Sequence, residues 1–264
     1  MVARANEMNL HPAFRPARLE DLVLWVNPSS VHGTTWQNLA PRYTDVNHGR
    51  IIGAQVGELL HPSGVFGSAL YFNGQNAYVN CGSDSSLDIT SQITIEAWVK
   101  TSYDFSSEPG FIVNKYNRNT PTGWALFFQT DNTVWMMNYE SLGNYKNAIS
   151  DSTKNDGNWH HLVGIILSDG TPILYVDGVE QTGSESAGSV TQLNSGSESV
   201  KIGVQSNPLE RYFNGPIAEV RIYEAALSPA EVFHNYTHSP IYYMQHGIDP
   251  YSLLYSREYG RVVA

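Results

Sequence analysis

Short runs of alternating apolar and polar residues, separated by tight turns, recur along the chain and constrain its fold more than any other feature. Residues 93–100 alternate Ile, Ile, Ala and Val with Thr, Glu, Trp and Lys, which is the period of a β-strand. Turn-forming pairs such as Asn73-Gly74, Asp131-Asn132 and Asp177-Gly178 separate such runs. The predicted strands span residues 22–26, 69–72, 77–80, 93–100, 123–130, 133–139, 159–167, 172–176, 200–204 and 217–223.

The composition agrees with an all-β chain. Charged residues make up 15% of the 264 residues, and long stretches with a helical period of 3.6 are scarce. All-β sandwiches of this size often form one domain, which is what we expect here. Two stretches rich in Ser and Gly or in acidic residues, 101–109 and 183–199, are predicted to be surface loops.

The charge and the single cysteine limit the classes of partner and site. The formal net charge is -10, which argues against a nucleic-acid surface, since such a surface needs clustered Lys and Arg. Cys81 is the only cysteine, so intrachain disulfides and cysteine-rich metal sites are excluded, and its VNCG context indicates a buried strand end. The chain begins with Met, and neither a signal-peptide pattern nor a membrane-spanning apolar run occurs, so we expect neither export by that route nor membrane insertion.

The segment from Tyr212 to Val232, YFNGPIAEVRIYEAALSPAEV, combines a strand with a helix start. Simple alternation places Ile217 on the same face as Glu219, Arg221 and Tyr223, and Ala218, Val220 and Ile222 on the other face. Ser228 precedes Pro229, and Glu231 follows three residues after the serine, which is the pattern of an N-cap with a capping box. A short helix is therefore predicted over residues 229–236.

Three segments, taken together, resemble the laminin-G-like jelly roll of the concanavalin A-like lectin/glucanase superfamily in its bacterial and viral form. They are GSALYFNGQNAYVNCG at 67–82, DGNWHHLVGIILSDGTPILYVDGVE at 156–180, and the closing segment. The resemblance covers residues 20–236. It implies an all-β fold, a two-sheet antiparallel jelly-roll sandwich that ends with the one short C-terminal helix. The residues outside it, 1–19 and 237–264, are expected to be extended terminal arms.

The resemblance also implies a calcium site in many members, with an Asp in an FDG turn and an Asp in a GxIDEV strand. Here these positions hold Asn73 and Ala218. Because calcium affinity depends on the number of charged oxygen ligands, we expect no metal and no other cofactor.

Catalysis finds little support in the sequence, and we expect no catalytic residues. Glycoside hydrolysis needs two carboxyl groups across the scissile bond, but Glu96 shares its strand face with Trp98 and Lys100 and no second acid. In WHHLVG, His160 and His161 lie on opposite faces of a predicted strand, which favours two hydrogen-bonded structural histidines beside a core Trp159.

Glycan binding is the better-supported ligand hypothesis, because sugars pack on flat aromatic faces flanked by polar groups. The alternative is that Trp135 lines the core and the tyrosines only cover loops. The candidate glycan residues are Tyr103, Tyr116, Trp135, Tyr139 and Tyr145, with Phe105 beside them and with Asn114 and Asn117 as polar partners.

The C-terminal arm carries too many apolar groups for a solvated linker, so it should dock on a surface. Either it packs on its own sandwich or it reaches a neighbouring subunit, and aromatic segments of this kind suit interfaces. The candidate partner-binding residues are Tyr242, Tyr243, Tyr251, Leu253, Leu254 and Tyr255.

The leading functional hypothesis is a non-catalytic structural protein of a virus particle: a capsid decoration, head-fibre or tail protein of a phage, anchored by its arms and touching host glycans. It predicts synthesis in the host cytoplasm, assembly with other protein subunits and a homo-oligomeric or shell-bound state. The alternative is a free, extracellular bacterial lectin. A polysaccharide-degrading enzyme is the third hypothesis.

Overall fold

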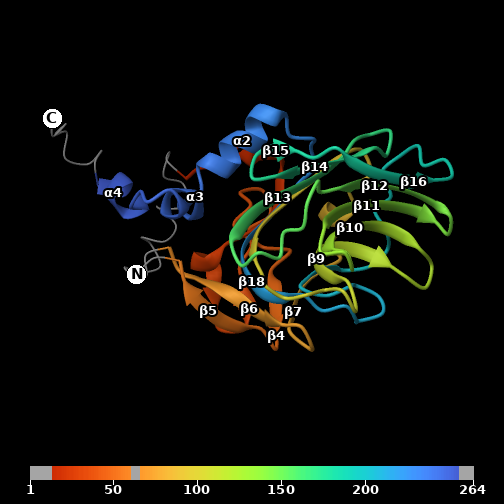
Figure 1. Cartoon of the computed structure of the whole chain (residues 1–264). Helices are drawn as coiled ribbons and strands as arrows, with labels where there is room; N and C mark the ends of the chain where they lie inside the picture. Colours follow the sequence, from red (N-terminus) through yellow and green to blue (C-terminus); the bar gives the residue numbers. More distant parts are fainter. Residues whose placement is uncertain (1–13, 61–65, 256–264) are drawn as a thin grey trace.

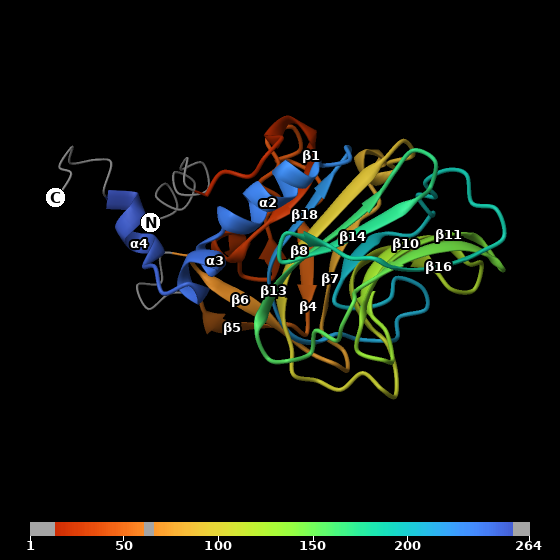
Figure 2. The ribbon, with the colours of Figure 1, turned by 45° about the horizontal axis from the view of Figure 1, so that its top comes forward.

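A computed structural model describes residues 14–60 and 66–255 of the chain, the side chains of Glu58, Leu59, Leu254 and Tyr255 excepted. It has two antiparallel β-sheets packed face to face, with three short helices near the C-terminus (Figures 1 and 2). The expected jelly-roll fold class is therefore confirmed.

Sheet A has eight strands in the order β15-β14-β13-β8-β18-β6-β5, with β1 paired to β18. The bounds are β1 Leu22–Val26, β5 Gln55–Leu59, β6 Ser68–Asn73, β8 Ile93–Lys100, β13 Trp159–Ile166, β14 Pro172–Val176, β15 Val179–Glu180 and β18 Asn214–Tyr223. Strands far apart in sequence are neighbours here: β18 pairs with β8, β6 and β1.

Sheet B has ten strands in the order β16-β12-β11-β10-β9-β17-β7-β4-β3-β2. The bounds are β2 Val31–His32, β3 Thr35–Trp36, β4 Gly49–Ile52, β7 Tyr78–Gly82, β9 Gly110–Asn117, β10 Thr122–Phe128, β11 Val134–Ser141, β12 Asn144–Ile149, β16 Gly183–Ala187 and β17 Val200–Ile202. Part of the predicted loop 183–199 is thus the edge strand β16. The sequence did not predict this strand because its residues are polar. An edge strand is held by backbone hydrogen bonds to one neighbour and needs no apolar face.

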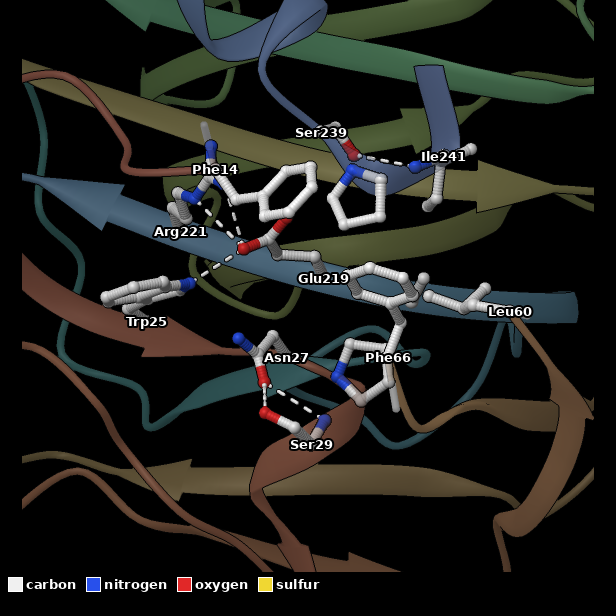
Figure 3. A pocket seen from close by; sticks show the side chains of 13 residues that line it. Phe14, Trp25, Asn27, Ser29, Leu60, Phe66, Glu219, Arg221, Ser239 and Ile241 are labelled. Carbon is white, nitrogen blue, oxygen red and sulfur yellow. Dashed lines mark hydrogen bonds and ion pairs between the residues drawn. The ribbon is translucent and has the colours of Figure 1, made fainter. Parts of the chain in front are cut away.

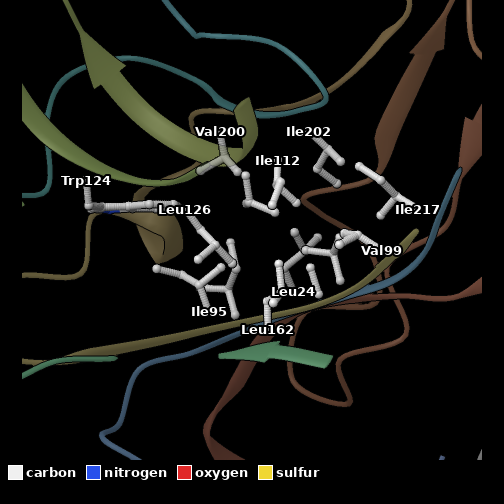
Figure 4. Close-up of a cluster of buried hydrophobic side chains, with 14 of the residues drawn as sticks. Leu24, Ile95, Val99, Ile112, Trp124, Leu126, Leu162, Val200, Ile202 and Ile217 are labelled. Carbon is white, nitrogen blue, oxygen red and sulfur yellow. The ribbon is translucent and has the colours of Figure 1, made fainter. Parts of the chain in front are cut away.

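The core lies between the inner faces of the two sheets (Figure 4). Sheet A contributes side chains such as Ile95 and Leu162, and sheet B contributes Trp124, Leu126 and Ile202. All of these are fully or almost fully buried, and each stabilises the sandwich by about 1.5–3 kcal/mol relative to exposure.

A β-bulge in β18 corrects the predicted faces of the closing segment. Ile217 pairs with Val99 and Glu219 with Trp98, so Ala218 is an extra residue between them. Ile217 therefore lies in the core with Val220, on the opposite face from Glu219. Simple alternation was wrong for Ile217, because one inserted residue shifts every side chain before it to the other face.

The helices are α2 Pro229–Thr237, α3 Pro240–Gln245 and α4 Pro250–Tyr255. The predicted helix corresponds to α2, and its Ser228 and Glu231 form the expected capping box. The other two helices lie in the segment expected to be an extended arm. Each also begins with a proline, after Ser239 and Asp249. No helix in the described part of the chain is long and apolar enough to cross a membrane.

Candidate functional site

A strip of aromatic side chains lies on the outer face of sheet B, away from the core, and lines a groove over β9 to β12 and β16. The groove encloses about 730 Å³ of empty space, open solvent included. Its rings are those of Trp135, Phe127, Phe111, Tyr116, Tyr139 and Tyr145.

The rings form a continuous series because the strand register places them next to one another. Phe127 is the cross-strand neighbour of Trp135 on one side and of Phe111 on the other. The Phe111 and Phe127 rings stack with centroids 4.8 Å apart, and Tyr139 stacks on its cross-strand neighbour Tyr145 at 5.0 Å. Aromatic cross-strand pairs stabilise a sheet, so the strip is rigid as well as apolar.

Gly123 of β10 lies between Tyr116 and Tyr139 in the register, and the absence of a side chain there lets the two rings meet at 5.7 Å. Its φ of +112° is in a region that other residues rarely adopt. A Cβ would stand 2.0 Å from the carbonyl oxygen of Lys115. This position therefore requires glycine.

Trp135, Tyr139 and Tyr145 are only partly buried, whereas Phe111 and Phe127 are buried beneath the groove surface. The Trp135 indole nitrogen donates to Thr133 Oγ1 over 2.9 Å, which holds the ring in place. The interpretation that Trp135 lines the core is therefore wrong. These three partly exposed rings offer flat apolar faces to a ligand.

Polar side chains surround these rings. Asn147 of β12 is buried, yet its Oδ1 has no hydrogen-bond partner among the described residues. Glu185 of β16 accepts a hydrogen bond from the Tyr145 hydroxyl over 2.6 Å. Gln129 and Arg211 also line the groove. A buried polar atom without a partner is costly, so a ligand hydroxyl that donates to Asn147 would remove that cost.

The groove tyrosines remain neutral at physiological pH. Burial raises the pKa of Tyr116 and of Tyr139, and the hydrogen bond to Glu185 raises the pKa of Tyr145. The hydroxyl groups of Tyr116 and Tyr139 therefore keep their protons and can donate to a ligand, whereas Tyr145 already donates its proton to Glu185.

The other predicted glycan residues lie elsewhere. Tyr103 lines a separate hollow with Tyr71 and Asn214, and Phe105 is buried in the core, stacked on Phe128 at 5.0 Å.

The two asparagines proposed as polar partners are already engaged. The Asn114 amide bonds to Val204 O and to the Ser206 amide, and the Asn117 amide bonds to Glu198. Asn147, Gln129, Glu185 and Arg211 were missed, although strict alternation with Tyr145 places Asn147 on the same strand face.

The two positions examined for calcium have structural roles. Asn73 Oδ1 accepts hydrogen bonds from the backbone amides of Gln75, Asn76 and Ala77, so it closes its own turn. Ala218 is buried in the bulge of β18. Within residues 14–60 and 66–255, no group of three His, Cys, Asp or Glu side chains could hold a metal ion.

Two carboxylates from neighbouring strands meet on the outer face of sheet A, because β18 pairs with β8 and brings Glu219 to the same face as Glu96. Arg221 lies between them and donates to Glu96 Oε2 over 3.0 Å and to Glu219 Oε1 over 2.8 Å. Trp25 Nε1 also donates to Glu219, as Figure 3 shows, and Asn235 of α2 donates to Glu96. Burial raises the pKa of Glu96, and the Arg221 charge opposes this shift. The two carboxylates and Arg221 together form a buried ion cluster beneath α2.

The two neighbouring histidines of β13 and the cysteine are engaged in hydrogen bonds or buried. His160 bonds to Asp177 over 2.7 Å and to Asp156 over 3.1 Å, as expected of a structural histidine. His161 is buried, but neither ring nitrogen has a hydrogen-bond partner in the described part of the chain, contrary to the expectation. Burial raises the pKa of the Cys81 thiol to about 12, so it remains protonated.

The C-terminal segment packs on the outer face of sheet A. Ile241 of α3 is buried in a cluster with Phe14 and Trp98, and the Tyr243 ring meets the Phe14 ring edge-on at 5.9 Å. Tyr242, Tyr251 and Leu253 pack against the same cluster. The side chains of Leu254 and Tyr255, and residues 1–13 of the proposed N-terminal arm, lie outside the described part of the chain.

A small pocket opens beside this cluster (Figure 3), with apolar walls that include Phe66 and Ile241. Among the described residues that line it, Glu219 is the only acid. A glycosidase site uses a pair of acids, and the described lining of this pocket supplies one.

Comparison with known proteins agrees with the fold. A family model described as the concanavalin A-like lectin/glucanases superfamily matches residues 73–233. Comparison with curated proteins gave no match.

Solved structures with the same fold share little sequence with this chain. The binding domain of Paraclostridial Mosquitocidal Protein 1 is 15% identical, with a TM-score of 0.61 over 83% of this chain and 52% of that one. The binding domain of botulinum neurotoxin DC in complex with SialylT is 9% identical, with a TM-score of 0.59 over 83% and 51%. A Trypanosoma rangeli sialidase is 14% identical, with a TM-score of 0.62 over 92% and 39%. The chain thus spans about half or less of each of these structures.

Proposed function

Because this chain belongs to the concanavalin A-like lectin/glucanase superfamily, we propose that it is a carbohydrate-binding protein whose aromatic groove on sheet B holds a glycan. The observation that carries this proposal is the combination of partly exposed, stacked rings with a buried amide oxygen that lacks a partner among the described residues. Sugar rings pack their apolar faces on Trp135, Tyr139 and Tyr145, and their hydroxyl groups bond to Asn147 and Gln129.

The similar structures support this proposal. Two of them are binding domains of protein toxins, and one of these was solved in complex with SialylT. Their low identity to this chain limits the support to the fold, so the ligand of the groove is inferred from its own residues.

Binding to a glycan array, followed by calorimetry with the best ligand, tests the proposal. We expect Trp135→Ala and Tyr139→Ala each to weaken binding at least about tenfold, since loss of one stacking ring removes about 1.5 kcal/mol or more. Tyr71→Ala is the matched control, because Tyr71 is an exposed tyrosine on sheet A. Binding that survives both groove substitutions but is lost in Tyr71→Ala would move the site to the second hollow.

We further propose that the protein is not an enzyme, because Glu96 and Glu219 are locked by Arg221 beneath α2. Incubation with the polysaccharide that it binds should release no reducing ends. Release that disappears in Glu219→Gln would overturn this part of the proposal.

A second proposal concerns assembly. Figures 1 and 2 place α4 at one end of the molecule, beyond α3 and away from both sheets. Tyr251 and Leu253 of α4 pack on this chain's own terminal cluster, and the position of the helix at the end of the molecule would also let a neighbouring subunit contact it. A virion protein anchored by its C-terminal segment would require such a contact, whether in a homo-oligomer or on a shell. Light scattering of the full chain and of a chain that ends at residue 248 tests it. A monomer in both cases, with no binding to phage capsids, would favour a free extracellular lectin.

A further inference from the structure

We propose that the groove selects saccharides that carry a carboxylate, and that Arg211 is the residue that binds this carboxylate. The inference rests on the proposed glycan function and adds the chemical class of the ligand. It is carried by the conformation, the hydrogen bonds and the electrostatic surroundings of Arg211, the only cationic residue among the described residues that line the groove.

The backbone holds Arg211 in an unusual conformation. Its φ is +59°, a left-handed region that residues with a large side chain rarely occupy. The loop is fixed there because the Phe111 amide donates to Arg211 O over 3.2 Å and Tyr212 forms a parallel bridge with Phe111. Strain of this kind persists where the surrounding structure imposes it, often at a ligand site. The hydrogen bond and the bridge to Phe111 attach the Arg211 loop to β9, directly beside the aromatic strip.

The guanidinium group is held in one orientation, but some of its N–H donors have no partner among the described residues. One Nη1 hydrogen bonds to Gln205 Oε1 over 3.2 Å, and Nε lies 3.7 Å from Glu210 Oε1. Nη2 has no partner among the described residues, and the side chain remains 22% exposed. Arginine has five N–H donors, so the second Nη1 hydrogen and those of Nη2 can bind a carboxylate through two parallel hydrogen bonds. The hydrogen bond to Gln205 orients these N–H donors before a ligand binds.

The charge around Arg211 is only partly balanced. Glu210 is shared, because it also pairs with Arg118, and Glu108 acts on Arg211 more weakly than Arg118 and Glu210 do. Burial lowers the pKa of Arg211, and the Arg118 charge lowers it further. Both effects disfavour the cation in the free protein, and the attraction of a bound anion would offset them. An anionic group at this end of the groove is therefore favoured over a hydroxyl group.

The opposite end of the groove carries the opposite charge. Glu185 lies on β16, and strands β12, β11 and β10 separate it from β9, on which the Arg211 loop is fixed. A carboxylate is repelled by Glu185 and attracted by Arg211, so an acidic saccharide binds in one direction only. The aromatic rings between the two ends hold the neutral part of the ligand.

Matched probes with the same sugar backbone test this inference. We compare polygalacturonic acid with its carboxyl-reduced form, and sialyllactose with its carboxyl-reduced form, in the wild-type full chain at low and moderate salt. The acidic member of at least one pair should bind tenfold or more tightly, and the difference should shrink as salt rises. In Arg211→Asn the preference should fall to twofold or less, while the neutral member still binds.

Asn is the preferred substitution because it adopts the left-handed conformation readily, so the loop can keep its shape. Arg211→Lys keeps the charge but not the paired donors, and it should retain only part of the preference. Arg50→Gln is the control for loss of one positive charge, since Arg50 is an exposed residue of β4, and it should leave the preference unchanged.

The outcomes distinguish failure of this inference from failure of the proposed glycan binding. Equal binding of the acidic and neutral members of both pairs, with both forms bound, overturns the role of Arg211 and leaves a lectin. An acid preference that survives in Arg211→Asn also overturns it. Failure to bind any glycan, in these pairs and on the array, overturns the proposed function itself.

Discussion

At the scale of single residues, the two neighbouring histidines of β13 differ because the strand turns their side chains in opposite directions. Burial alone would lower the pKa of His160, but the hydrogen bonds and charges of Asp177 and Asp156 outweigh it, and the pKa is raised. The His161 ring packs against the rings of Trp98 and Tyr236, which also stack on each other, and burial lowers the pKa of His161 well below the usual value. Its Nε2 is 3.9 Å from Glu96, too far for a hydrogen bond. Adjacent histidines thus make stability depend on pH in opposite ways.

His160 stabilises the fold most when it is protonated. Its folded pKa is above the unfolded value, so the stabilisation is fully present below about pH 6.5 and is lost as pH rises through the folded pKa. His160→Gln should therefore cost about 1 kcal/mol at pH 5.5, given that both partners are partly exposed, and less at pH 8.5. Urea unfolding at the two pH values measures this difference. His161 is present in both proteins, so its own titration cancels. A larger cost at pH 8.5 would contradict the assignment.

His161 has the opposite effect. Its folded pKa is depressed, so the native state loses stability as pH falls below about 6.5, where the unfolded chain takes up the proton. His161→Phe keeps a flat ring against Trp98 and Tyr236 and removes two buried nitrogens that lack hydrogen-bond partners among the described residues. We expect it to raise the free energy of unfolding by about 1 kcal/mol at pH 8 and by more at pH 5. Thermal unfolding across this pH range would show the trend, and a gain that shrinks towards pH 5 would refute it.

At the scale of elements, the bulge in β18 decides which side chains α2 covers. The extra residue Ala218 shifts the strand so that Ile217 and Val220 both face the core, while Glu219 and Arg221 face outward beneath the helix. Arg221 then joins β18 to β8 through Glu96. A strand irregularity, a helix and an ion cluster therefore form one structural unit.

Loss of the arginine should disrupt this unit. Arg221→Met leaves Glu96 and Glu219 buried without their cation, and breaking a buried pair in this way costs about 3–5 kcal/mol. Chemical unfolding measures the change, and Arg50→Met is the exposed control, expected within about 0.5 kcal/mol of wild type. A well-packed apolar cluster can replace a buried ion cluster of similar volume. The triple variant Glu96→Leu, Glu219→Leu, Arg221→Met should therefore recover much of the stability that Arg221→Met loses.

At the scale of the whole molecule, the two faces of the sandwich have different roles. The outer face of sheet A is covered by α2, by α3 and by the chain around Phe14, whereas the outer face of sheet B carries the aromatic groove. Chain segments from both ends of the described sequence therefore meet on one sheet and leave the other sheet open to a ligand. A substitution that destabilises the packing of the terminal segments on sheet A should therefore leave the affinity of the groove for its ligand unchanged.

Ile241 provides the test of this separation. Ile241→Ala should lower the free energy of unfolding by about 2–5 kcal/mol, because the side chain is almost fully buried against Phe14 and its neighbours. Ile248→Ala is the matched control, since Ile248 is 44% exposed. Both variants should bind the best glycan with unchanged affinity at temperatures where they are folded. Loss of binding in folded Ile241→Ala would mean that the two faces are coupled.

Several strands, the tight turns and the cap of α2 could be predicted because they depend on residues close together in sequence. The segment 93–100 forms β8 as predicted, and Asp177 adopts the positive φ that its turn requires. The starts of α3 and α4 carried the same Ser-Pro or Asp-Pro signal as α2, but the sequence interpretation treated that segment as an arm.

The candidate site could be predicted only in part. Tyr116, Trp135, Tyr139 and Tyr145 were identified as aromatic candidates, and the strand register brings them together, but Tyr103 lies elsewhere.

The sequence by itself thus determined the fold class and the supply of aromatic side chains, because periodicity and turn chemistry act over a few residues. Tertiary structure alone decided which side chains meet. Pairing between distant strands places Trp135 beside Phe127 and Glu219 beside Trp98, and a bridge to β9 brings Arg211 to the groove. A shift of one residue in register reverses the face of every side chain in a strand, so a local pattern cannot settle these contacts.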